Sequence, residues 1–151
     1  MVKFKVNIII SRRIEVVAEA LINPVNFTYW ETDLKRYVVV KGVPGVTGCT
    51  ALLFFSNNGN SYMMEEELVH CNPGRNYVSI LKGTTLEARV ETILIPSGEE
   101  TLMTLIWSGK GKTFPVRLIL PFMRGRMIRQ AEAELDKFRK LVETKGVDFS
   151  C

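Results

Sequence analysis

The side chains that could carry acid–base chemistry lie in one short segment of the chain. Tyr62, Glu66 and His70 share this segment, and His70 is the only histidine. General acid–base catalysis needs a positioned titratable group, so if the protein is an enzyme we expect Glu66, His70 or Tyr62 to serve as its acid or base. The alternative is that His70 is structural and that the acidic run 65–67 lies on a solvated strand edge. Strand alternation places Glu66 on the opposite face from its two acidic neighbours.

Other patterns that would indicate a cofactor are missing from the sequence. Cys49, Cys71 and Cys151 have neither CxxC nor Cys/His spacing, so we expect no metal site, no disulfide framework and free thiols. Residues 109–113 lack the glycine spacing of a phosphate-binding loop. The net charge of +4 is too mild to indicate a nucleic-acid partner. We therefore expect no cofactor and no nucleic acid.

Length and composition indicate one globular domain over residues 1–151. The chain is 46% hydrophobic and 24% charged, which is ordinary for a protein with a packed core. No apolar run approaches the roughly 20 residues that span a membrane. Lys3 and Lys5 precede an apolar run that is too short for a secretory signal and has no small-residue cleavage site, so we expect a cytoplasmic protein.

The hydrophobic periodicity predicts the order of elements. Residues 2–10 form a strand, a short amphipathic helix follows Ser11 and ends at Asn23-Pro24, and a second short helix covers Pro24 to Trp30. Turn residues then separate six strands, expected at 37–40, 50–55, 62–71, 77–81, 84–95 and 101–108. Apolar residues at helical spacing predict one long final helix over residues 121–145, with Gly146 as its stop.

These elements predict an α+β fold in which the long helix covers the sheet. We expect a curved seven-stranded antiparallel sheet wrapped around the C-terminal helix, with two short helices between the first and second strands. A bent sheet around one helix leaves space between them, and an apolar space of this kind is where hydrophobic ligands bind.

Four features of this order resemble the START-like helix-grip superfamily (SRPBCC), which includes polyketide cyclases and dehydratases and lipid-transfer domains. They are the opening strand with the segment from Ser11 to Leu21, the Asn23-Pro24 to Trp30 stretch, the turn at residues 69–75 and the closing helix with Leu135, Phe138 and residues 141–143. The turn is similar to the strand-ending "dPPr" of these proteins, although Gly74 stands where many relatives have a second proline. A second departure is the very apolar segment 114–123, which we expect at the mouth of the cavity.

The resemblance implies a small hydrophobic or amphipathic ligand, such as a lipid, sterol, quinone or polyketide, held between the sheet and the last helix. Large apolar residues on the strands and helices are the expected contacts: Phe27, Trp30, Phe55, Met64, Val90, Met103, Leu105, Trp107, Met123 and Met127. Two alternatives stay open. A cyclase or dehydratase would use the same cavity, and a protein-binding regulatory module would have a filled interior and a large exposed apolar patch.

A cluster of arginines suggests one further partner. Arg124, Arg126 and Arg129 lie beside the apolar residues 118–123, and apolar segments rimmed with arginine bind anionic membrane surfaces. Transient contact with such a membrane while a ligand enters or leaves is our hypothesis. The alternative is that the arginines are solvated and the apolar side chains are packed.

Overall fold

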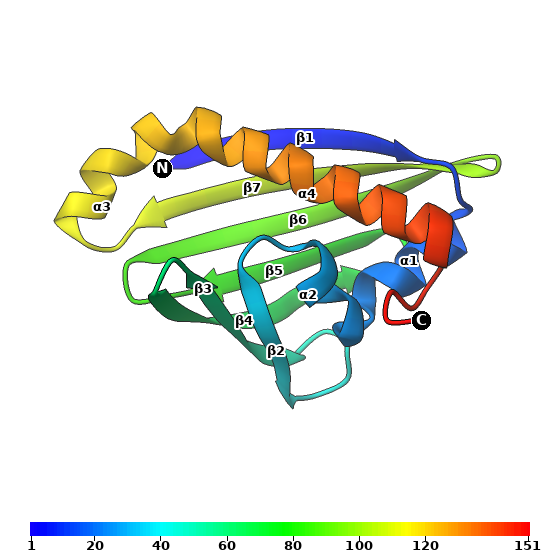
Figure 1. Ribbon diagram of the computed structural model, residues 1–151, viewed down its shortest axis with the longest axis horizontal. Helices are drawn as coiled ribbons and strands as arrows, with labels where there is room; N and C mark the ends of the chain where they lie inside the picture. Colours follow the sequence, from blue (N-terminus) through cyan, green and yellow to red (C-terminus); the bar gives the residue numbers. More distant parts are fainter.

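The computed structural model describes residues 1–151 and consists of one antiparallel sheet and the helices on its concave face (Figure 1). The strands are β1 (Val2–Ile10), β2 (Leu34–Lys41), β3 (Thr50–Asn57), β4 (Asn60–Asn72), β5 (Asn76–Lys82), β6 (Leu86–Ser97) and β7 (Glu100–Gly111). Their order in the sheet is β1-β7-β6-β5-β4-β3-β2, and every pair is antiparallel. The seven-stranded curved sheet predicted from the sequence is confirmed.

The first strand, β1, pairs with the last strand, β7, so β1 and β2 lie at opposite edges of the sheet. Between them the chain forms α1 (Ile14–Ile22), a 3-10 turn η1 (Pro24–Asn26) and α2 (Phe27–Trp30). The two predicted short helices are therefore present. The first begins later than the spacing after Ser11 suggests, because Arg13 is still extended and the Ser11 N–H is bound by a carboxylate oxygen of Glu143 at 2.8 Å.

Tight turns set the strand boundaries where the sequence predicts them. Asn58 and Gly59 both have positive φ, at 49° and 83°, as a two-residue hairpin turn requires, because this turn matches the twist of the strands. Several other strands run one to three residues beyond the expected ends, because sheet pairing continues into the residues that flank each apolar run, whereas β6 begins two residues later than expected, at Leu86.

The C-terminal helix lies across the concave face of the sheet and packs along β1 (Figure 1). It is α4 (Arg124–Lys145), preceded by α3 (Phe114–Ile119) and the 3-10 turn η2 (Leu120–Met123). The apolar stripe of α4 buries Ala131, Leu135, Phe138 and Val142. Gly146 ends the helix at φ 78°, with its N–H donating to the Val142 carbonyl at 2.9 Å, as predicted. None of the helices combines the length and the hydropathy of a membrane-spanning segment.

The main core lies between α1, α4 and the β1 side of the sheet. Ile10, Val17, Phe138, Val142 and Phe149 are fully buried there. The C-terminal tail is fixed by Asn26, whose amide donates to the carbonyls of Ala20 and Val147 and whose oxygen accepts the Phe149 N–H. This contact holds the short helices against the end of α4. The other half of the concave face is not filled in this way.

Candidate functional site

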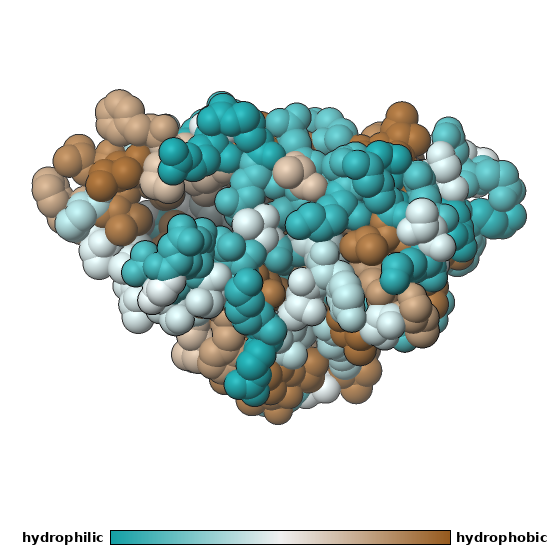
Figure 2. Space-filling model, viewed as in Figure 1, coloured by the Kyte–Doolittle hydropathy of each residue, from teal (hydrophilic) through white to brown (hydrophobic).

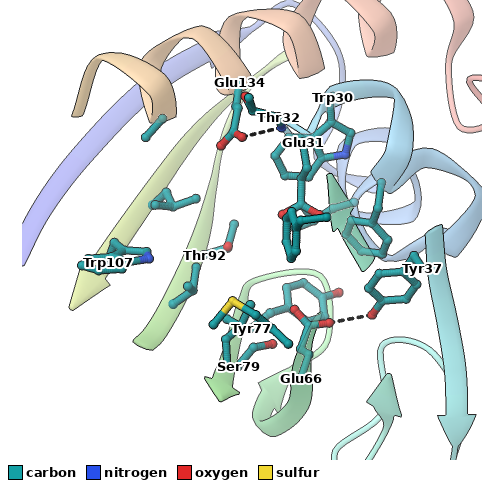
Figure 3. A pocket seen from close by; sticks show the side chains of 18 of the residues that line it. Trp30, Glu31, Thr32, Tyr37, Glu66, Tyr77, Ser79, Thr92, Trp107 and Glu134 are labelled. Carbon is teal, nitrogen blue, oxygen red and sulfur yellow. Dashed lines mark hydrogen bonds between the residues drawn. The ribbon is translucent and has the colours of Figure 1, made fainter. Parts of the chain in front are cut away.

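A cavity of about 360 Å³ lies between the concave face of the sheet and α4 (Figure 3). Of its 29 lining residues, 19 are hydrophobic. The floor comes from alternate residues of the strands, because successive side chains of a strand point to opposite faces. The roof comes from Met127, Ala131 and Glu134, which follow one another at helical spacing on α4, and the α2 side is closed by Phe27 and Trp30.

Aromatic pairs stiffen the walls of the cavity. On one side the Trp107 ring stacks on Phe4, with ring centroids 5.4 Å apart. On the other side Phe27 stacks on Tyr37 at 4.3 Å, and Trp30 packs edge-on against the buried Phe138 at 5.1 Å. Stacked and edge-to-face pairs hold rings in fixed positions. The cavity is therefore bounded by large apolar surfaces that are already in place.

All charged side chains in the lining are acidic. They are Glu31, Asp33, Glu66 and Glu134, and no lysine, arginine or histidine accompanies them. Tyr37 donates its hydroxyl to Glu66 at 2.6 Å, and Glu134 accepts the Thr32 backbone N–H at 2.6 Å. Figure 3 shows these two pairs on different sides of the cavity, with Trp107 on a third side. The polar part of an otherwise apolar cavity is thus a set of carboxyl groups.

Burial controls the ionisation of these carboxyl groups. Loss of solvent raises the pKa of Glu31 well above its ordinary value, and the charges of Glu66 and Glu134 raise it further. Burial also raises the pKa of Glu66, against the lowering effect of the Tyr37 hydrogen bond, and that of Glu134, against the hydrogen bonds from Thr32. Burial, together with the charge of Glu66 and the hydrogen bond to it, raises the pKa of the Tyr37 hydroxyl, which stays protonated. Protonation of one carboxyl group relieves the repulsion on the others.

One carboxyl group of the lining lacks a hydrogen-bond partner within the protein. The Glu31 carboxyl group lines the cavity and accepts no hydrogen bond, so it is available to a bound molecule or to water. The indole Nε1 of Trp30 also has no partner, but it is buried and points away from the cavity (Figure 3). No set of three His, Cys, Asp or Glu side chains is arranged to hold a metal ion.

The structure brings most of the predicted contact residues together. The ones that line the cavity are Phe27, Trp30, Phe55, Met64, Val90, Leu105, Trp107 and Met127. Met103 and Met123 do not. Met103 is on the same face of β7 as Leu105 but lies fully buried in the core. Met123 is 38% exposed in η2, because the 3-10 turn displaces it from the stripe of α4 that faces the sheet.

The three candidate acid–base residues separate in the structure. Glu66 and Tyr62 line the cavity, whereas His70 does not. Tyr62 stands at the rim, 55% exposed and stacked on Phe55 at 4.9 Å. His70 is exposed, because the pairing of β4 with β5 shifts register between Leu68 and His70 and breaks the alternation. His70 is therefore not an acid or base of this cavity, which corrects the expectation from the sequence.

The apolar segment 114–123 also lies elsewhere than expected. None of its residues lines the cavity, so it does not form the mouth. Conversely, Glu31, Glu134 and Tyr37 were missed as site residues. Glu134 follows Met127 and Ala131 at helical spacing, a signal that could have placed it on the cavity face. Glu31 carries no comparable signal, since it follows the last residue of a short helix.

Comparison with known proteins establishes the fold and goes no further. No protein-family model matches the sequence, and no curated protein matches it. Among solved structures, a conserved protein from Geobacillus kaustophilus is similar with a TM-score of 0.80 and 14% identity, over 96% of this chain and 97% of that one. A START superfamily protein from Mycobacterium smegmatis gives a TM-score of 0.72 at 11% identity, over 89% and 94% of the two chains.

An enzyme is among the similar structures. The Zhui aromatase/cyclase from Streptomyces sp. R1128 has a TM-score of 0.72 and 11% identity, over 92% of each chain. The chain has the START-like helix-grip fold that the sequence motifs resemble. At these identities the likeness concerns the backbone, since one fold supports many functions and the side chains of the cavity determine which one applies.

Proposed function

We propose that this protein binds a small, largely apolar molecule in the cavity between the sheet and α4, and that the molecule presents a hydrogen-bond donor or a positive charge to the carboxyl groups. The observation that carries the proposal is the composition of the lining: hydrophobic walls with Glu31, Asp33, Glu66 and Glu134 and no basic side chain. An apolar cavity with a few convergent polar groups is the usual form of a ligand site.

The carboxyl groups favour some ligands over others. Ionised carboxylates accept hydrogen bonds and attract cations, whereas a ligand carboxylate, sulfonate or phosphate would meet like charge. Hydroxyl, amine or amide groups on an apolar skeleton fit this arrangement, and a free fatty acid fits it poorly. Among the lipid, sterol, quinone and polyketide classes expected from the sequence, hydroxylated and amine-bearing skeletons are therefore favoured.

A catalytic role in the same cavity is the second candidate. The favouring observation is Glu66, which lies inside the cavity, is bound to the Tyr37 hydroxyl and has a raised pKa. A carboxyl group of raised pKa is suited to give or take a proton near neutral pH. A cyclase or dehydratase would use Glu66 in this way, and binding of the substrate is common to both candidates.

Some sequence predictions stay predictions. The cytoplasmic location rests on the lack of a recognisable signal segment, and the single-domain organisation over residues 1–151 rests on length and composition. A protein-binding regulatory module was expected to have a filled interior, and the open cavity argues against that alternative.

Two probes of the same shape test the charge preference. N-phenyl-1-naphthylamine is neutral, and 8-anilino-1-naphthalenesulfonate adds a sulfonate to the same aromatic frame. We expect the neutral probe to bind at least about tenfold more tightly, a difference of about 1.4 kcal/mol. At a pH above the raised pKa of Glu31, Glu31→Gln should narrow the difference, because it removes a charge without removing a hydrogen bond. Equal affinities for the two probes, or tighter binding of the sulfonate, would contradict the proposed ligand class.

A matched pair of substitutions tests the location. Leu105 and Ile106 are neighbours on β7, but only Leu105 faces the cavity. Leu105→Trp should take up part of the space and weaken probe binding by about tenfold or more, whereas Ile106→Trp places the same bulk on the opposite face and should leave the affinity within about twofold. Unchanged affinity in Leu105→Trp, with the variant still folded by circular dichroism, would place the probe outside the cavity.

A further inference from the structure

Large apolar side chains are exposed together at one end of the molecule. The exposed fractions are 75% for Phe114, 60% for Leu118, 52% for Ile119, 87% for Phe122 and 38% for Met123. We call these five residues of α3 and η2 the apolar tip. Figure 2 shows hydrophobic atoms gathered at this end, where Figure 1 places α3 and the start of α4. Such a concentration on a protein surface indicates an interaction site.

The charges around the apolar tip are of one sign. From residue 101 to residue 131 the chain has no Asp or Glu, whereas it has Lys110, Lys112, Arg117, Arg124, Arg126 and Arg129. None of these six forms an ion pair, although Arg13, Arg89, Arg139 and Lys140 elsewhere do. The positive charge beside the apolar tip is therefore not neutralised by ion pairs within the protein.

A groove at the base of α3 gathers part of this charge. Its lining includes Lys110, Lys112 and Arg117 next to Leu120, and Glu87 is its only carboxylate. Glu87 lies opposite Lys110 in the sheet, so Lys110 is partly offset. The guanidinium of Arg117 donates to the Gly111 carbonyl at 3.2 Å, which fixes its position without cancelling its charge.

We propose that the apolar tip docks on an anionic membrane surface, with Phe114 and Phe122 inserted among the lipids and the surrounding arginines held by the headgroups. The proposal goes beyond ligand binding and does not depend on it. Charge complementarity selects the partner, since an anionic bilayer offers apolar depth below a negative surface. The six-residue length of α3 suits shallow insertion at the interface, not a span.

Vesicle co-sedimentation tests this proposal directly. The vesicles are phosphatidylcholine alone, or phosphatidylcholine with one quarter phosphatidylglycerol, in low salt and in 0.5 M NaCl. We expect binding to the anionic vesicles in low salt, strong weakening in high salt and little binding to phosphatidylcholine, because salt screens the headgroup attraction. Absence of binding to anionic vesicles in low salt would overturn the proposal, as would equal binding to both kinds of vesicle.

Variants locate the contact on the protein. The double variant Arg126→Gln with Arg129→Gln removes two cations that make no hydrogen bond. Each lost cation should weaken vesicle binding by about fivefold, which is the contribution of one basic residue at an anionic surface. The control is Lys35→Gln with Lys41→Gln on β2, which makes the same change in net charge at a distant edge. Equal weakening in both double variants would show a non-specific charge effect and refute the docking surface.

The apolar contribution has its own matched pair. Phe122→Gln should weaken vesicle binding by tenfold or more, whereas Ile95→Gln, which replaces a 48% exposed residue at the other end of the sheet, should not. An unchanged affinity in Phe122→Gln would contradict insertion. If the apolar tip instead joins two copies of the chain, sedimentation velocity will show a dimer that Phe122→Gln dissociates. That result would overturn membrane docking and identify a second copy of the chain as the partner. Binding of N-phenyl-1-naphthylamine should be the same in all these variants, which separates this proposal from the ligand proposal.

Discussion

Asn26 is the buried polar residue on which the arrangement of the short helices depends. Pro24 has no N–H to donate to the Ala20 carbonyl, which a continuing helix would have satisfied. The Asn26 amide donates to that carbonyl at 2.9 Å instead, and its oxygen accepts the Phe149 N–H at 2.8 Å. Replacement of Asn26 by leucine, whose side chain has the same number of heavy atoms and the same branching, leaves both backbone groups buried and unpaired.

The cost follows from the two lost hydrogen bonds. An unsatisfied buried group costs about 1–3 kcal/mol, so Asn26→Leu should lower the free energy of unfolding by about 2–6 kcal/mol. Loss of the hydrogen bond from Asn26 to the Val147 carbonyl adds no further cost, because Asn23 also donates to that carbonyl at 3.1 Å. A loss of this size is a large part of the roughly 5–15 kcal/mol that stabilises a domain.

Urea denaturation followed by tryptophan fluorescence measures this loss. With an m-value of about 2 kcal/mol/M, the midpoint for Asn26→Leu should fall by about 1–3 M. The control is Asn60→Leu, because Asn60 is exposed and its side chain makes no hydrogen bond, and its midpoint should stay within about 0.3 M of the parent protein. A loss below 1 kcal/mol for Asn26→Leu would refute the reasoning that these two backbone groups depend on Asn26.

Three further substitutions have defined outcomes. In Gly109→Ala the new Cβ would lie 2.3 Å from the Trp107 ring, so the ring must move, and we expect about tenfold weaker binding of N-phenyl-1-naphthylamine; unchanged affinity would show that the ring does not shape the site. Glu31→Gln should stabilise the protein at neutral pH but not near pH 4 in urea titrations. Burial raises the folded-state pKa of Glu31, so the charged group costs stability as the pH rises from about 4.3 through that value; equal stability at pH 7 would contradict this. Phe138→Ala removes a fully buried ring that packs on Trp30 and should cost about 3–5 kcal/mol by the same assay, whereas a cost below 1 kcal/mol would contradict its place in the core.

Local sequence signals were sufficient for the fold. Turn residues such as Asn58-Gly59 have a conformational requirement that the chain itself shows, and Gly146 ends α4 for the same reason. Helical spacing placed Met127 on the cavity side, and strand alternation placed Leu105 with Trp107. These inferences needed only residues a few positions apart in the chain. The fold has one sheet, and only one helix is long enough to cover it.

Glu66 was among the candidates, but its partner and the other carboxyl groups of the site could not be predicted in the same way. Tyr37 on β2 meets Glu66 on β4 across the intervening strand, so their pairing depends on the register of three strands. One irregularity in the pairing beyond Leu68 was enough to misplace His70. Met103 was misplaced for another reason, since the packing of helices against one half of the sheet determines where the cavity ends.

The central claim is that the space under α4 holds a small molecule, and native mass spectrometry of the freshly purified protein tests it most directly. We expect a species heavier than the chain by one small, mostly apolar compound, which organic extraction then identifies, and we expect less of that species in Leu105→Trp. A spectrum that contains only the mass of the chain, together with no fluorescence enhancement of N-phenyl-1-naphthylamine, would contradict the claim.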